Sequence, residues 1–143
     1  MRPCDNSPMQ LLARLTALVF AISAIPALAQ EYQPYPSPRI TLEQWAKYGE
    51  TVRQYHGGSL DLLKDNQLVA FSDQRTRTFW VFTLKEHPAH PAWITRQMYE
   101  EGGLVRVRQI GYFAGSEEEF AKLFSEFQKR NEELKEDVGR RNQ

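Results

Sequence analysis

Thr78-Phe-Trp-Val-Phe-Thr-Leu84 is a short run of β-branched and aromatic residues, the composition typical of a β-strand. Side chains alternate along a strand, so both faces of this one are apolar: Trp80, Phe82 and Leu84 share one face, and Phe79 and Val81 share the other. Such a strand belongs in the middle of a sheet. Either both faces of that sheet are covered, or one aromatic face is left bare.

Three similar runs surround this strand, at residues 68–71, 93–99 and 104–110. Turn-forming residues separate them, and Gly102-Gly103 can adopt the positive φ values of a tight hairpin before the last run. The connections are too short for parallel crossovers, so the pattern predicts an antiparallel meander. Residues 59–63 are either a fifth strand or a loop, because their leucines fit neither the helical nor the strand period.

A helix is expected on the N-terminal side of the sheet. Thr41 and Gln44 have the spacing of a capping box, in which each side chain bonds to the backbone of the other residue. The apolar positions that follow repeat at helical spacing, which predicts a helix from Leu42 to His56. Gly57-Gly58 is expected to end it as a left-handed C-terminal cap.

A second helix is expected on the C-terminal side. Ser116 and Glu119 form another capping box at its start. Its apolar stripe repeats at intervals of three and four residues: Phe120, Leu123, Phe124, Phe127, Asn131 and Leu134. The sequence therefore predicts an α+β fold with an N-terminal helix, an antiparallel four- or five-stranded β-meander, and a C-terminal helix packed on one sheet face.

The first 29 residues have the three parts of an export signal. Arg14 supplies the positive charge, residues 15–25 form an apolar run, and Ala27-Leu28-Ala29 places small residues at the cleavage site. An uncleaved membrane anchor is the alternative, but a spanning helix needs about twenty apolar residues. We expect cleavage near Ala29, with either Met1 or Met9 as the start of translation.

The remaining chain is divided by composition. Residues 30–40 are rich in proline and tyrosine and are expected to be a linker, residues 41–138 a single domain, and residues 139–143 a disordered tail. Cleavage removes Cys4, the only cysteine, so the mature chain cannot form a disulfide of its own. A disulfide-free exported domain indicates a bacterial periplasmic or secreted protein.

The charge of the mature chain is nearly balanced. Without Arg2, Arg14 and Asp5, it keeps 16 lysines and arginines against 17 aspartates and glutamates. This balance gives no support to nucleic-acid binding or to association with a membrane after the signal is cleaved.

The three histidines are candidate metal ligands. His87 and His90 are each followed by proline, and a polyproline conformation would point both rings the same way. With His56 or Glu86 as a third ligand, they could hold zinc or copper. The alternative is a loop stiffened by its prolines, with solvated or hydrogen-bonded histidines.

The last strand carries two arginines on one face. Arg106 and Arg108 alternate with Val105 and Val107, which are expected to meet the helices. If the arginines share a bare face with Trp80, and with Arg77 or Arg96 beside them, the surface would suit an anionic ligand or a partner protein. The plainer alternative is that the arginine stems cover surface aromatics.

The sequence carries no motif specific to a catalytic chemistry. We therefore expect an exported, non-enzymatic binding or interaction domain that contacts a protein or small anionic ligand through Trp80, Arg96, Arg106, Arg108, His87 and His90. The alternative is a metal-binding protein or a small metal-dependent hydrolase built on His56, His87 and His90. An inhibitor of a secreted enzyme and a homodimer both remain open within the binding class.

Overall fold

The computed structural model describes residues 32–141. The predicted signal peptide and its cleavage site lie outside the described residues. In chain order the elements are α2 (Leu42–His56), β1 (Asp61–Leu63), β2 (Leu68–Asp73), β3 (Thr78–Thr83), β4 (Ala92–Glu101), β5 (Leu104–Phe113) and α3 (Glu117–Arg141). The predicted α+β fold, with a helix on either side of an antiparallel sheet in the chain, is confirmed.

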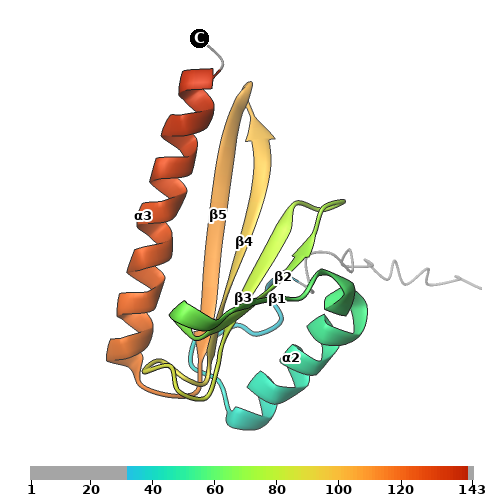
Figure 1. The fold of residues 1–143 in the computed structure, drawn as a ribbon, viewed down its shortest axis with the longest axis vertical. Coiled ribbons are helices and arrows are strands. Elements are labelled where there is room, and N and C mark those ends of the chain that lie inside the picture. Colours follow the sequence, from blue (N-terminus) through green and yellow to red (C-terminus); the bar gives the residue numbers. More distant parts are fainter. Residues whose placement is uncertain (1–31, 142–143) are drawn as a thin grey trace, which may run out of the picture.

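The sheet is a five-stranded antiparallel meander with the strand order β1-β2-β3-β4-β5. Residues 59–63 supply the fifth strand only in part, since β1 is three residues long and pairs Leu62 with Val69. Gly102 and Gly103 have φ values of 59° and 75°, so the hairpin between β4 and β5 has the expected geometry. This hairpin projects well beyond the other strands (Figure 1).

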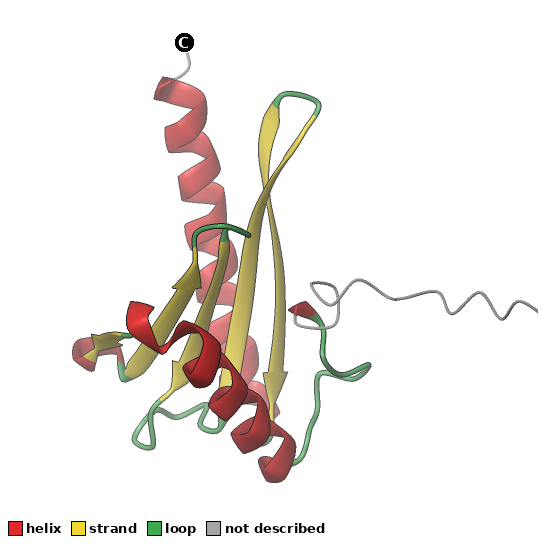
Figure 2. Cartoon of the chain, turned by 90° about the vertical axis from the view of Figure 1, so that its right-hand side faces the viewer, coloured by secondary structure: helices red, strands yellow, loops and turns green. Residues whose placement is uncertain are grey.

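A helix lies on each face of the sheet. Helix α3 runs along one face and α2 crosses the lower part of the other, as the two perpendicular views show (Figures 1 and 2). The aromatic face that the sequence leaves open as bare is therefore buried under a helix. We call the two sides of the sheet the α2 face and the α3 face.

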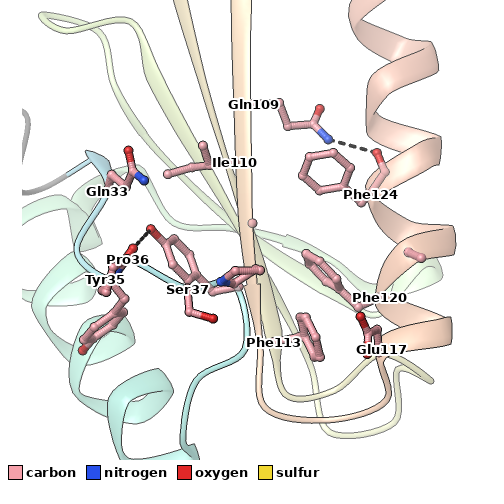
Figure 3. Close-up of a pocket in the computed structure, with 14 residues that line it drawn as sticks. Gln33, Tyr35, Pro36, Ser37, Gln109, Ile110, Phe113, Glu117, Phe120 and Phe124 are labelled. Atoms are coloured by element: carbon pink, nitrogen blue, oxygen red, sulfur yellow. Dashed lines mark hydrogen bonds between the residues drawn. The ribbon is translucent and has the colours of Figure 1, made fainter.

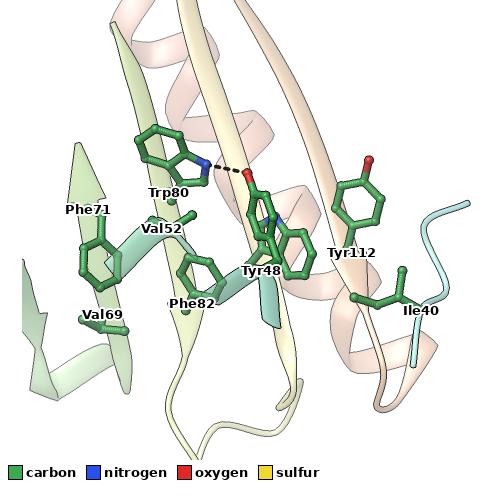
Figure 4. Packing of buried hydrophobic residues seen from close by; sticks show 9 residues of the cluster. Ile40, Tyr48, Val52, Val69, Phe71, Trp80, Phe82 and Tyr112 are labelled. Carbon is green, nitrogen blue, oxygen red and sulfur yellow. Dashed lines mark hydrogen bonds between the residues drawn. The ribbon is translucent and has the colours of Figure 1, made fainter. Parts of the chain in front are cut away.

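The α2 face holds most of the aromatic core (Figure 4). Its buried residues are Ile40, Tyr48, Val52, Val69, Phe71, Trp80, Phe82, Trp93 and Tyr112. Tyr48 of α2 stacks on Trp93 with ring centroids 4.3 Å apart, and its hydroxyl accepts a hydrogen bond from Trp80 Nε1 at 2.9 Å. The helix is thus held to β3 and β4 by both packing and a buried polar contact.

The α3 face has a second core. Its buried residues are Leu68, Val81, Ala89, Ala92, Ile94, Phe113, Phe120, Leu123 and Phe127. Gly111 lets α3 approach β5 closely, because a Cβ there would lie 2.6 Å from Phe120 Cζ. The apolar stripe predicted for the C-terminal helix therefore faces the sheet.

The helix ends agree with the sequence only in part. Both bonds of the predicted capping box at Thr41 and Gln44 are present. The predicted left-handed cap is wrong, since Gly57 has a φ of −59° and the chain continues into a 3₁₀ turn over Gly57–Ser59. Ser59 Oγ donates to the His56 carbonyl at 2.7 Å, so this carbonyl is satisfied without a left-handed residue.

The two ends of the described chain are more ordered than expected. Helix α3 begins with a bond from Glu119 N to Ser116 Oγ at 3.3 Å and continues past Val138 to Arg141. The proline-rich segment expected to be a linker is attached to the fold. Phe113 N donates to the Pro38 carbonyl at 2.9 Å, and Phe113 O accepts from Ile40 N at 3.0 Å.

Candidate functional site

The structure does not bring the predicted binding residues onto one surface. Trp80 faces α2 and is only 1% exposed. The ring of His56 stacks against it with centroids 4.6 Å apart. Trp80 is therefore a core residue, and no partner can reach it in this fold.

The arginines of β4 and β5 lie on opposite faces. Arg96 pairs in register with Gln109, and Arg108 pairs with Gln97, which places Arg96 on the α3 face and Arg108 on the α2 face. Arg106 lies with Arg108 and forms an ion pair with Glu101 at 3.6 Å. The guanidinium of Arg108 lies 4.5 Å from the Tyr99 ring centroid, which agrees with the alternative of arginine stems covering aromatics.

The histidines also point in different directions. Residues 84–90 form two successive turns, with His87 N bonded to Leu84 O and His90 N bonded to His87 O, so the loop is not the expected polyproline helix. His90 contacts Trp45 of α2 at a ring-centroid distance of 5.0 Å. The charges that act on His87 are those of Glu126 and Glu119 on α3 and that of His90.

His90 contacts Trp45 near the start of α2, whereas His56 is the last residue of that helix, eleven residues or ~16 Å further along its axis. Among residues 32–141, no group of three or more His, Cys, Asp or Glu side chains is arranged to hold a metal ion. The proposed third ligand, His56, is thus too distant to complete a site with His87 and His90.

A groove runs along the free edge of β5 (Figure 3). We call it the edge groove. It has a volume of about 470 Å³ and is bounded by residues 33–38 on one side, residues 109–113 along its floor, and the first turns of α3 on the other side. Phe120 and Phe124 form the α3 wall, and Tyr35 and Pro36 lie opposite them (Figure 3).

The floor of the edge groove consists largely of backbone. The amide and carbonyl of Phe113 point away from β4, since they bond to Ile40 and Pro38. Backbone direction alternates along a strand, so the amides and carbonyls of Gly111 and Gln109 point the same way. Within residues 32–141 these outward groups have no hydrogen-bond partner.

Pro38 explains why the pairing stops at Phe113. Arg39 and Phe113 form an isolated parallel bridge. In a continued parallel ladder, the Gly111 carbonyl would accept from the amide of residue 38, but proline has no amide hydrogen. The chain therefore leaves the edge at Pro38, and the space beside Gly111 remains open.

The electrostatics of the edge groove are mild. Burial raises the pKa of Tyr35 and of Tyr112, so both phenols stay protonated at neutral pH, and Tyr112 Oη donates to the Tyr35 carbonyl at 2.8 Å. Glu117 lies at one end and forms an ion pair with Arg39 at 3.1 Å. The groove therefore suits an uncharged, extended ligand better than an ionic one.

The edge groove does not follow from the sequence patterns above, which predict that the proline-rich segment is a linker. The available signals were Gly111 within a run of strand-forming residues, which indicates a close approach, and the position of the last strand at an edge of the meander.

Among residues 32–141, no helix is long and apolar enough to cross a membrane. Comparison of the chain with models of protein families, with curated proteins and with solved structures finds no match. The function is therefore inferred from the geometry alone.

Proposed function

We propose that this protein is an exported, non-enzymatic interaction module that binds an extended segment of a partner protein along the free edge of β5. The observation that carries the proposal is the row of outward backbone groups from Val105 to Gly111, which ends in the edge groove. An added strand would satisfy these groups as in other cases of β-strand addition.

The two sheet edges differ in a way that supports this site. β1 is three residues long, and such short strands are a usual means of blunting an edge. β5 is ten residues long, and the parallel bridge to Arg39 occupies only its last residue. A long strand edge without a partner in the described chain is a template for another strand.

The shape and chemistry of the edge groove favour a single extended chain as the occupant. The arm at residues 33–38 and the first turns of α3 stand on either side of the strand edge (Figure 3). Backbone pairing would supply affinity, and alternate apolar side chains would contact Phe120 and Phe124 on one side and Tyr35 on the other.

The exported location is part of the same proposal and is supported by the signal-like segment that ends near Ala29. Intact-mass analysis of the protein recovered from a periplasmic or culture fraction tests it. A species that begins near Gln30 is expected, and a full-length species found only in the cytosol would contradict export.

Strand addition can be tested with a fluorescein-labelled peptide of about eight alternating valine and threonine residues, the length of the open edge. Fluorescence anisotropy should show saturable binding. Val105→Pro removes one outward amide without touching the β4 ladder and should abolish binding, whereas Val105→Thr keeps that amide and should retain it. Circular dichroism confirms that both variants are folded.

Pro38→Ala provides a second, opposite test. It restores the amide that the Gly111 carbonyl lacks, so the arm can pair further along β5 and compete with the peptide. Peptide binding should weaken in this variant. Equal binding by wild type, Val105→Pro and Pro38→Ala, or a dimer that the peptide cannot displace, would show that the edge does not bind such segments.

A further inference from the structure

A second cavity lies between α3 and the upper part of the sheet, away from the edge groove. We call it the arginine pocket. It has a volume of about 360 Å³. Its walls are apolar except at one side, where two guanidinium groups and an amide lie: Phe79, Met98, Val107 and Leu134, with Arg96, Arg130 and Asn131.

Arg96 and Arg130 both lack an acidic partner in the described part of the chain. Arg96 donates from Nη1 to Asn131 Oδ1 at 3.1 Å, while its buried Nε has no hydrogen-bond partner in the described chain. Within residues 32–141, neither Arg96 nor Arg130 forms an ion pair. Of the other arginines, Arg77, Arg106 and Arg140 are each paired with a carboxylate, whereas Arg108 on the sheet lies against the Tyr99 ring.

The same two arginines both lie against the ring of Phe127 and both line the arginine pocket. Their guanidinium carbons lie 4.9 Å and 5.0 Å from the ring centroid of Phe127. Burial, and next the charge of Arg130, lowers the pKa of Arg96, so the two positive charges repel one another. An anion bound at both guanidinium groups would offset this repulsion.

We propose that the arginine pocket binds a small amphipathic carboxylate, with its head at Arg96 and Arg130 and its hydrocarbon tail against Phe79, Met98, Val107 and Leu134. A planar guanidinium matches a carboxylate in geometry and charge. The volume lies at the lower end of the range for small-molecule sites, which fits a short chain and not a large lipid. This site is independent of peptide binding at the β5 edge.

Octanoate is a suitable probe, measured by calorimetry and by NMR of the purified protein. Saturable binding is expected, with shifts in the Asn131 side-chain amide resonances that locate the ligand. Octanol, which lacks the charge, and acetate, which lacks the tail, should each bind at least about tenfold more weakly, the loss expected for one charged hydrogen bond or several buried methylenes.

Variants at exposed positions test the arginine without disturbing the core. Arg130→Gln should weaken octanoate binding about tenfold, and Lys129→Gln, the same charge change at the preceding residue, should not. Leu134→Glu places a carboxylate in the pocket and should abolish binding, while Leu134→Gln should retain most of it. Absence of saturable binding, equal affinity for octanol, or equal effects of the Arg130 and Lys129 variants would overturn the proposal.

Discussion

At the scale of single residues, Tyr48 joins α2 to the sheet by two contacts that a substitution can separate. Tyr48→Phe keeps the stack on Trp93 but leaves the indole of Trp80 without its acceptor, at a site where the Tyr48 and Trp80 side chains are 6% and 1% exposed. We expect the free energy of unfolding to fall by about 1–3 kcal/mol.

Urea denaturation followed by tryptophan fluorescence measures this loss. Tyr55→Phe is the control, because Tyr55 lies on the same helix with 70% of its surface exposed and should change stability little. A Tyr48→Phe variant as stable as the control would show that the bond to Trp80 contributes nothing.

His87 predicts a dependence of stability on pH. Burial lowers the pKa of His87, and the charges of Glu126 and Glu119 oppose this shift only in part. The neutral ring accepts a hydrogen bond from Ala89 N at Nδ1, 3.0 Å away, which a protonated ring cannot do. The unfolded chain therefore takes up a proton more readily than the folded one, and the contribution of His87 is complete above pH ~6.5 and declines as the pH falls towards its folded pKa.

The variant for this test is His87→Asn, whose side-chain oxygen can accept the same bond without titrating. The stability of the wild type should decline more steeply than that of the variant between pH 7 and pH 5, in urea titrations at a series of pH values. Parallel pH profiles would mean that His87 is not held neutral by the fold.

At the scale of elements, the contact between α3 and the sheet contains a polar chain within an apolar stripe. Asn131 is buried, accepts from Arg96, and donates to Gln109 Oε1 at 2.6 Å. Gln109 Nε2 in turn donates to the Phe124 carbonyl at 2.9 Å. Each polar group thus depends on its neighbour, as is usual in buried networks.

Asn131→Leu should therefore destabilise the protein although it makes the stripe more apolar. The variant leaves Arg96 Nη1 and Gln109 Oε1 without hydrogen-bond partners, and we expect a loss of about 1–3 kcal/mol in chemical denaturation. Glu133→Leu, an exposed change on the same helix, should stay within about 0.5 kcal/mol of wild type. A stabilised Asn131→Leu variant would indicate that packing outweighs the network.

At the scale of the whole molecule, one sheet serves both cores, so its two layers should unfold together. All three tryptophans, Trp45, Trp80 and Trp93, belong to the α2 face, whereas α3, the longest helix described, covers the other. Fluorescence therefore reports one layer, and far-ultraviolet circular dichroism is weighted towards the other. Their urea transitions should coincide, and separate midpoints would mean that the layers unfold independently.

Much of this architecture could be predicted from local patterns, because caps, periods and turns are local properties. The capping box at Thr41, the cap at Ser116 and the glycine pair at Gly102 mark element boundaries that the structure confirms, although only one of the two bonds predicted at Ser116 is present. The candidate site could not be predicted in the same way. The two-residue turn at Gly102-Gly103 sets the register that puts Arg96 and Arg108 on opposite faces. The edge groove, in contrast, depends on where residues 33–38 and α3 lie beside β5, and local patterns do not reveal this.

The residues missed by sequence reasoning share a long-range cause. The doubly apolar stretch at residues 78–84 indicates burial but not which helix covers each side. His56 is separated from the Trp45 contact of His90 by most of the length of α2. The sequence shows that these residues are possible ligands but not how far apart they lie. Pro38 acts through Gly111, more than seventy residues away in the chain, so its role emerges only when the two are side by side.

The inequality of the two sheet margins limits how copies of this protein could assemble. A fibre grows by strand pairing only if every subunit has two sheet margins that can pair, because each added subunit must offer a free margin to the next one. Here β1 is too short to offer one of those margins. Any association through the ten-residue margin would be capped after a single event, which protects the domain against open-ended polymerisation even at high concentration.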